Sequence, residues 1–173
     1  MLTSLFQYKA WANAGLLAAV AGIDGERFPD ELRKAIRILN HTHVVDRIFA
    51  AHLTGTTHAH AATNTEETPG LAALAEGVRR SDAWYVGYVR DLETGSIDER
   101  IRFRFTDGQA GEMSRGEMLH HLIAHGAYHR GAVGAILKSL SIKPPADTFT
   151  AYLHATQPQR REAAASQGNG NAA

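Results

Sequence analysis

The stretch from Ser114 to Leu140 constrains the fold most, because it reads as one long helix that carries four of the ten histidines. Ser114 and Glu117 have the spacing of a capping box, in which a hydroxyl and a carboxylate close the start of a helix. Prolines 144 and 145 stop the helix at its far end. With a rotation of about 100° per residue, one helix face collects apolar side chains and three histidines. This predicted face comprises Met118, His121, Leu122, His125, His129, Ala132, Val133 and Ile136.

The three histidines on this face stand one helical turn apart, so neighbouring imidazoles are stacked along the helix. A single buried histidine is usually a hydrogen-bonded core residue, but two at i and i+4 can reach one divalent ion together. The residues alone leave two pairs open, His121 with His125 and His125 with His129. Leu122 occupies the position of the glutamate in an HExxH motif, which argues against a zinc protease of that kind.

Apolar spacing and breaker residues predict the other elements. Ile101, Phe103 and Phe105 alternate with arginines, the period of a half-buried strand, and Asp107-Gly108 is a turn signal. We therefore expect an all-α four-helix bundle in which a short hairpin or extended segment interrupts the long crossover before the last long helix. The remaining helices are predicted at residues 3–20, 30–53, 69–92 and 148–156, with Asp30, Thr68 and Asp147 as N-caps.

The second predicted helix supplies another inward histidine. Its apolar stripe consists of Ile38, Val45 and Ile48, and His41 and His52 lie on the same face. His43 points to the opposite side, where we expect it to be solvated. In a bundle, His41 could meet the histidines of residues 114–140, and three nitrogen ligands with open positions are typical of a catalytic metal site.

Several polar residues have less certain partners on sequence grounds. Asp82 falls within the inward stripe of the third helix, so it has either a buried partner or a surface salt bridge with Arg79 or Arg80. We expect Asp46 to form a salt bridge at the surface or between helices. We expect Arg130 to form a salt bridge on the helix surface, where an anionic substrate could also contact it.

The loop at residues 55–68 is polar and small, and we expect its two histidines, His58 and His60, to be mobile surface residues with at most a weak metal role. Glu117 and His120 form one ExxH motif. A ferritin-like di-iron site needs two such motifs and further glutamates, which argues against that class.

Composition limits the function classes further. Lysine plus arginine and aspartate plus glutamate number 18 each, so there is no electrostatic footprint for nucleic acid or an acidic membrane. The chain of 173 residues contains no cysteine and no apolar run of membrane-spanning length. We expect one domain at residues 1–156, a disordered polar tail at 157–173, and a cytoplasmic location.

Several segments together resemble the DinB/YfiT-like family of metal-binding four-helix-bundle proteins. They are YKAWAN from Tyr8, LNHTHVVDR from Leu39, FRFTDGQAGEMS from Phe103, HLIAHGAYHRG from His121 and PPADTFTAYL from Pro144. The resemblance implies a bundle, often dimeric, that binds one divalent metal ion through three histidines. By matching positions these are His41, His125 and His129, so the resemblance selects the second of the two pairs.

The chain departs from the family pattern beside the ligands. Ala124 and Ala132 stand where asparagine and glutamine are usual, and Thr42 and His43 where apolar residues are common. These departures affect contacts around the ligands more than the ligands themselves.

Relatives implied by the resemblance include thiol-dependent S-transferases and a mycothiol-dependent isomerase. The hypothesis is a metal-dependent enzyme, an S-transferase or hydrolase, that activates a water or an external low-molecular-weight thiol. The ion would be zinc, nickel or iron, the substrate a small molecule, and the protein a homodimer. His121 is a candidate proton shuttle or a support for a ligand. The alternative is a non-catalytic metal-binding stress-response protein on the same scaffold.

Overall fold

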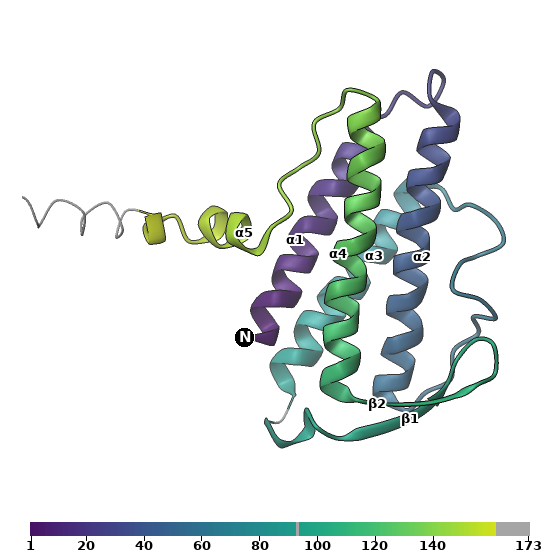
Figure 1. Ribbon diagram of the computed structural model, residues 1–173, viewed down its shortest axis with the longest axis vertical. Helices are drawn as coiled ribbons and strands as arrows, with labels where there is room; N and C mark the ends of the chain where they lie inside the picture. Colours follow the sequence, from purple (N-terminus) through teal and green to yellow (C-terminus); the bar gives the residue numbers. More distant parts are fainter. Residues whose placement is uncertain (93, 162–173) are drawn as a thin grey trace, which may run out of the picture.

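Four long helices lie side by side and form the body of the molecule, and a two-stranded hairpin crosses one end of them (Figure 1). The computed structural model describes residues 1–92 and 94–161. The expected all-α four-helix bundle with a hairpin in its crossover is confirmed. In chain order, the elements are α1 (Leu2–Ala21), α2 (Pro29–Thr54), α3 (Leu71–Asp91), η1 (Thr94–Ser96), β1 (Arg100–Arg104), β2 (Ala110–Ser114), α4 (Arg115–Ser139) and α5 (Phe149–Thr156).

The order of the helices around the bundle decides which side chains can meet. Helix α1 packs mainly against α3, and α2 packs mainly against α4, while α1 and α2 barely touch. The short helix α5 lies to the side and contacts α1 (Figure 1). Because α2 and α4 are neighbours, histidines on their facing sides lie within reach of one another.

Two predicted N-caps are wrong, those of α2 and α3. Phe28 caps α2, because Pro29 takes the first helical position, where its missing N–H and fixed φ suit a helix start. Asp30 then lies in the first turn, where its charge faces the positive end of the helix dipole. Helix α3 begins after Gly70, so Thr68 is outside it.

The predicted cap of α5 is also displaced by one residue. Thr148 is the N-cap, and its hydroxyl accepts a hydrogen bond from the backbone N–H of Ala151 at 3.1 Å. Asp147 instead accepts hydrogen bonds from Arg130, which explains why it does not cap the helix. Residues 157–161, the first part of the predicted tail, form a turn with two backbone hydrogen bonds, and residues 162–173 lie outside the described residues.

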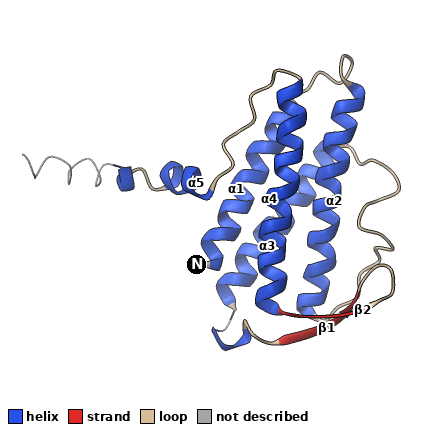
Figure 2. Ribbon diagram, in the orientation of Figure 1, coloured by secondary structure: helices blue, strands red, loops and turns tan. Residues whose placement is uncertain are grey.

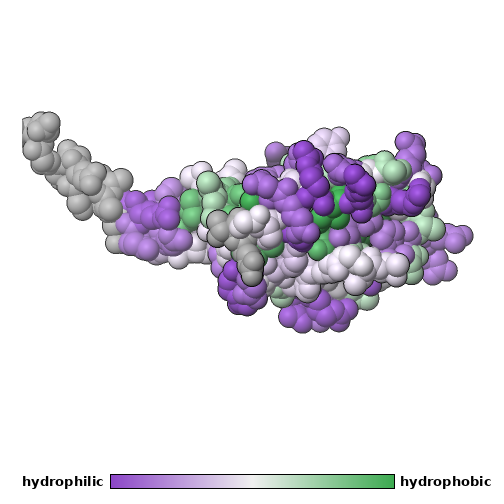
Figure 3. Space-filling model, turned by 90° about the horizontal axis from the view of Figure 1, so that it is seen from below, coloured by the Kyte–Doolittle hydropathy of each residue, from purple (hydrophilic) through white to green (hydrophobic). Residues whose placement is uncertain are grey.

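The hairpin matches the predicted alternation. Strands β1 and β2 are antiparallel, with Arg100 opposite Ser114 and Arg104 opposite Ala110 (Figure 2). Gly108 has φ +85° in the connecting turn, a conformation that favours glycine. Phe103 is buried beneath the hairpin, while the arginines of β1 point to solvent. Seen from the hairpin end, the surface is mostly hydrophilic, with small apolar patches between polar groups (Figure 3).

Within the described residues, the core has two large apolar clusters and a smaller one. The first large cluster gathers around Leu16, Leu39, Val78 and Leu137, and the second around aromatic and aliphatic residues near the hairpin. The small cluster consists of Tyr8, Ala12 and Tyr152. Charged and amide side chains on the helices are also buried: Lys9, Asn40, Asp46, Asp82 and Arg130. No helix among residues 1–92 and 94–161 has both the length and the apolar character needed to cross a membrane.

Candidate metal centre

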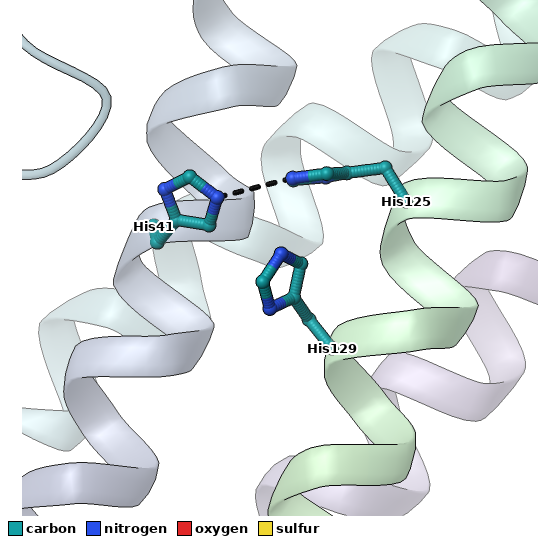
Figure 4. A group of neighbouring side chains, drawn as sticks. All are labelled: His41, His125 and His129. Atoms are coloured by element: carbon teal, nitrogen blue, oxygen red, sulfur yellow. Dashed lines mark hydrogen bonds between the residues drawn. The ribbon is translucent and has the colours of Figure 1, made fainter.

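Three histidines from two neighbouring helices converge on one point. His41 extends from α2, and His125 and His129 extend from successive turns of α4 toward it (Figure 4). One ring nitrogen from each lies within 4.8 Å of the other two, and each residue is half-buried. His41 Nε2 and His125 Nε2 are 3.0 Å apart. The structure thus brings together the three residues selected by the sequence resemblance, in an arrangement that could hold a metal ion.

The position of the pair on α4 differs from the predicted apolar face. The buried stripe runs through Met118, Leu119, Leu122, Val133 and Leu137, whereas Ala132 is exposed. The histidines therefore lie at the border of the core and not at its centre. This border faces α2, which leaves the imidazoles accessible from solvent while their rings rest on the bundle.

A backbone carbonyl outside both helices fixes the orientation of His41. His41 Nδ1 donates a hydrogen bond to the carbonyl oxygen of Thr63 at 2.7 Å. Because a carbonyl only accepts, the proton of neutral His41 lies on Nδ1, and Nε2 offers a lone pair toward His125. A carbonyl partner on the second ring nitrogen is the usual support of a metal-binding histidine. Sequence reasoning missed Thr63, because a backbone carbonyl has no residue-type signal.

The loop that carries Thr63 is held by amide side chains. Asn40 Nδ2 donates to Asn64 Oδ1 at 2.5 Å and to Thr65 Oγ1 at 2.6 Å, and Asn64 Nδ2 donates to the carbonyl of Arg37 at 3.0 Å. Asn40 is the residue directly before His41 and is buried. The loop is therefore anchored to the same helix turn as the ligand that it orients.

Electrostatics keep the cluster in the form that binds metal. Burial, followed by the neighbouring imidazoles of His129 and His41, lowers the pKa of His125 to about 3. Burial and His41 likewise lower the pKa of His129. At neutral pH these rings are uncharged and their lone pairs are available. Three imidazoles with converging nitrogens suit a divalent zinc, nickel or iron ion, so the donor set fits the group that the resemblance implies.

His121 lies beside the triad and is not part of it. Its ring stacks between His125, at a centroid distance of 5.2 Å, and Phe49, at 5.0 Å. The residue is exposed, and its ring nitrogens have no hydrogen-bond partner within residues 1–92 and 94–161. Burial of part of the ring lowers the pKa of His121. It is thus an uncharged imidazole one turn from a ligand.

The ExxH motif serves the start of α4. The Glu117 carboxylate accepts from the backbone N–H of Ser114 at 2.6 Å, and the Ser114 hydroxyl accepts from the backbone N–H of Glu117 at 3.1 Å. This confirms the predicted capping box. His120 Nδ1 donates to the Gly116 carbonyl at 2.8 Å. Among the described residues, the histidine triad is the one group of three or more side chains with metal-ligand spacing.

A buried charge network links α1, α2 and α3. Lys9 Nζ contacts Asp46 Oδ2 at 2.6 Å and Asp82 Oδ1 at 2.8 Å, and Asn13 donates to the second oxygen of Asp82. Arg79 and Arg80 pair with Glu76 instead, so of the two readings of Asp82 the buried partner is correct. Burial lowers the pKa of Lys9, but the two carboxylates outweigh it and raise that pKa overall.

Arg130, next to His129, is buried, which corrects the surface salt bridge expected from sequence. Its Nε donates to Asp147 Oδ2 at 2.8 Å, and its Nη2 lies 3.4 Å from the Tyr8 hydroxyl. The Tyr8 hydroxyl donates to the other Asp147 oxygen at 2.5 Å. Arg130 therefore ties the segment before α5 to α1 and α4 and is not free to meet a substrate.

His43 is half-buried between α2 and α3, so the prediction that it is solvated is wrong. A Cβ atom added at Gly77 would lie 2.8 Å from His43 Nε2, which is too close for a carbon atom. The glycine in α3 therefore leaves room for the His43 ring. Its Nδ1 lies 3.4 Å from Ser81 Oγ. Burial, with Arg47 and Lys9 nearby, lowers the pKa of His43 to about 4.

Comparison with known proteins agrees with this architecture. The chain is similar to Protein DinB of Bacillus subtilis (strain 168), with 19% identity over 166 residues that cover 90% of this chain and 95% of that protein. The model of the DinB family matches residues 1–162, which include helices α1 to α5 and the histidine triad. Since the match extends over nearly the whole chain, this protein belongs to the DinB family.

Proposed function

We propose that this protein is a metal-dependent enzyme that holds one divalent transition-metal ion on His41, His125 and His129. The observation that carries the proposal is the convergence of one nitrogen from each residue within 4.8 Å. The bond from His41 Nδ1 to Thr63 supports it, because it leaves the inward nitrogen without a proton. Zinc, nickel and iron all accept such ligands, and their availability would decide among them.

Three protein ligands leave at least one coordination position for a small molecule. A divalent ion bound to the three histidines would lower the pKa of a water or a thiol at this open position, and so would supply a nucleophile at neutral pH. Since the chain has no cysteine, a thiol nucleophile would have to come from a low-molecular-weight compound. The proposed reaction class is therefore S-transfer from an external thiol or hydrolysis by water.

The protein's own residues provide orientation and proton transfer. Thr63 and Asn40 fix the direction of His41, and the i, i+4 spacing fixes His125 and His129 on one side of α4. We assign His121 as the residue that takes up the proton of the nucleophile at a ring nitrogen. Its imidazole is exposed, lies against His125 and has no hydrogen-bond partner in the described part of the chain.

Metal content per chain tests the ligand assignment. Elemental analysis of the wild type should give about one ion per chain, and His41→Ala, His125→Ala and His129→Ala should each lose most of it, because two imidazoles bind far more weakly than three. His121→Ala and the control His120→Ala, which removes an imidazole bonded to its own helix, should keep their metal. Full occupancy in all three ligand variants would refute the site.

Turnover tests catalysis separately. Metal-loaded protein should convert mixtures of electrophile and thiol, or activated esters, and metal-stripped protein should not. His121→Ala should keep its ion but lose roughly 10²–10⁴-fold in kcat if it carries the proton. Equal inactivity of loaded and stripped protein across thiols and esters would replace the enzyme proposal with non-catalytic metal binding.

A further inference from the structure

A polar cavity lies between α2 and α3, whereas the candidate metal centre lies between α2 and α4. After α2, residues 55–70 run back along the outside of the bundle toward the start of α3 (Figure 1). The first part of this loop, the end of α2 and the middle of α3 line a solvent-open cavity of about 590 Å³. Its polar and aromatic lining residues are Arg47, Thr54, Thr56, Thr57, His58, His60, Ser81, Trp84 and Tyr85.

The formal charge at the lining of this cavity is positive and comes from Arg47. Arg47 is exposed and forms no hydrogen bond or ion pair with any residue of 1–92 and 94–161. No aspartate or glutamate from the described residues lines the cavity. Burial is the largest cause that lowers the pKa of His60, and the Arg47 cation and His58 add to it.

One imidazole at this site has an unfilled hydrogen-bonding position. His58 Nδ1 is buried and has no partner, and its ring packs against His52 at a centroid distance of 5.3 Å and near His60 at 6.1 Å. Buried ring nitrogens in folded proteins are normally hydrogen-bonded, so an unpaired one calls for a ligand group. The histidines here do not have metal-ligand spacing, since within the described residues that spacing occurs at the triad.

We propose that this cavity is a binding site for a small organic anion that presents a carboxylate or phosphoryl group to Arg47, His58 and His60. A guanidinium fork matches either group, and the hydroxyls of Thr57 and Ser81 add donors at the wall. Trp84, which is 37% exposed, forms an aromatic side of the cavity that suits the apolar body of the ligand. The site is separate from the metal centre and does not depend on the proposed reaction.

Trp84 provides a direct readout of binding. The chain has two tryptophans, and Trp11 packs on Tyr152 beside α5, so a Trp11→Phe background isolates the signal of Trp84. The full-length protein is titrated with sodium benzoate and, separately, with inorganic phosphate, with chloride added to constant ionic strength. We expect a saturable change in fluorescence with at least one of them. Saturation by benzoate alone identifies a carboxylate site, and saturation by phosphate alone identifies a phosphoryl site.

Charge-matched variants show whether the anion occupies this cavity. Arg47→Gln should weaken binding roughly tenfold or more, because it removes the charged hydrogen-bond donor. Arg33→Gln, an exposed arginine earlier on α2, makes the same change in net charge and should bind like the parent protein. Both variants should keep the metal of the wild type, so failure here is distinct from failure of the triad.

Two results would overturn the proposal. One is the absence of a saturable change with either anion. The other is equal affinity in Arg47→Gln and Arg33→Gln, which would place the anion elsewhere, including at the metal centre. A second variant, His60→Gln, tests the cavity independently of any structural change that Arg47→Gln causes around position 47. It should also weaken binding, and unchanged affinity in both His60→Gln and Arg47→Gln would exclude the cavity.

Discussion

Individual residues at the centre of the bundle set the electrostatic balance. Lys9 is 2% exposed and contacts two carboxylates from two other helices. A buried ion pair contributes little net stability compared with apolar residues of the same size, but the loss of one partner leaves an uncompensated charge. Lys9 therefore contributes to stability mainly because it neutralises two buried carboxylates, and less through the strength of its ion pairs.

Lys9→Met should therefore lower the free energy of unfolding by about 3–5 kcal/mol, because Asp46 and Asp82 would face each other without a cation. Urea denaturation monitored by circular dichroism measures the change. Lys34→Met, an exposed lysine on α2, serves as the control and should change stability little. Adding Asp46→Asn to Lys9→Met should recover part of the loss. A destabilisation as small as that of the control would show that the network is not coupled.

Among the elements, α4 begins with a complete capping box. Its capping box satisfies backbone groups at the first turn from both directions, and the bond to Ser114 lowers the pKa of Glu117. The helix starts directly after β2, whose last residue is Ser114. The cap therefore fixes where the strand ends and, through the helix register, where His125 and His129 point.

Ser114→Ala should destabilise the protein by about 1 kcal/mol, the usual effect of removing an N-cap hydroxyl. Thermal and urea unfolding of metal-free protein give this value directly. Ser139→Ala, at the other end of α4, removes a hydroxyl that bonds only the Ile136 carbonyl and should be close to neutral. If both serine variants behave alike, the capping box has no special role.

At the scale of the whole molecule, the buried histidines make the stability of the protein depend on pH. Several histidines have pKa values lowered by burial, including His43 to about 4 and His125 to about 3. The unfolded chain, with histidine pKa values near 6.5, binds more protons than the folded chain below that pH. The stability from these uncharged rings is therefore fully present above about pH 6.5 and is lost as the pH falls toward 4.

We expect metal-free protein to lose stability between pH 7 and pH 4.5, and His43→Leu to lose less of it. Between pH 7 and pH 4.5, the two proteins should differ by about 2 kcal/mol in the free energy of unfolding that they lose, after allowance for the partial exposure of His43 to solvent. Urea unfolding at pH 7, 6, 5 and 4.5 in the presence of a chelator measures both curves. Parallel curves would mean that His43 titrates normally in the folded protein.

Local patterns predicted the helices and the hairpin well, because they depend on neighbours in the chain. Apolar spacing marked every long helix, Ser114 and Glu117 marked the start of α4, and Asp107-Gly108 marked the turn. The caps of α2, α3 and α5 were misplaced because several candidate residues stand side by side there. The choice among them depends on backbone geometry and on competing tertiary partners, as Asp147 shows.

The sequence by itself determined that His125 and His129 share one helix face and that His41 can face them, and its resemblance to a family selected the triad. Only the tertiary structure decided that Thr63 orients His41, that Lys9 neutralises Asp46 and Asp82, and that His43 is enclosed against Gly77. The physical reason is the range of each interaction. Helical spacing is a property of adjacent turns, whereas a buried charge or a ring nitrogen takes whichever partner the packing of distant segments brings within hydrogen-bond distance.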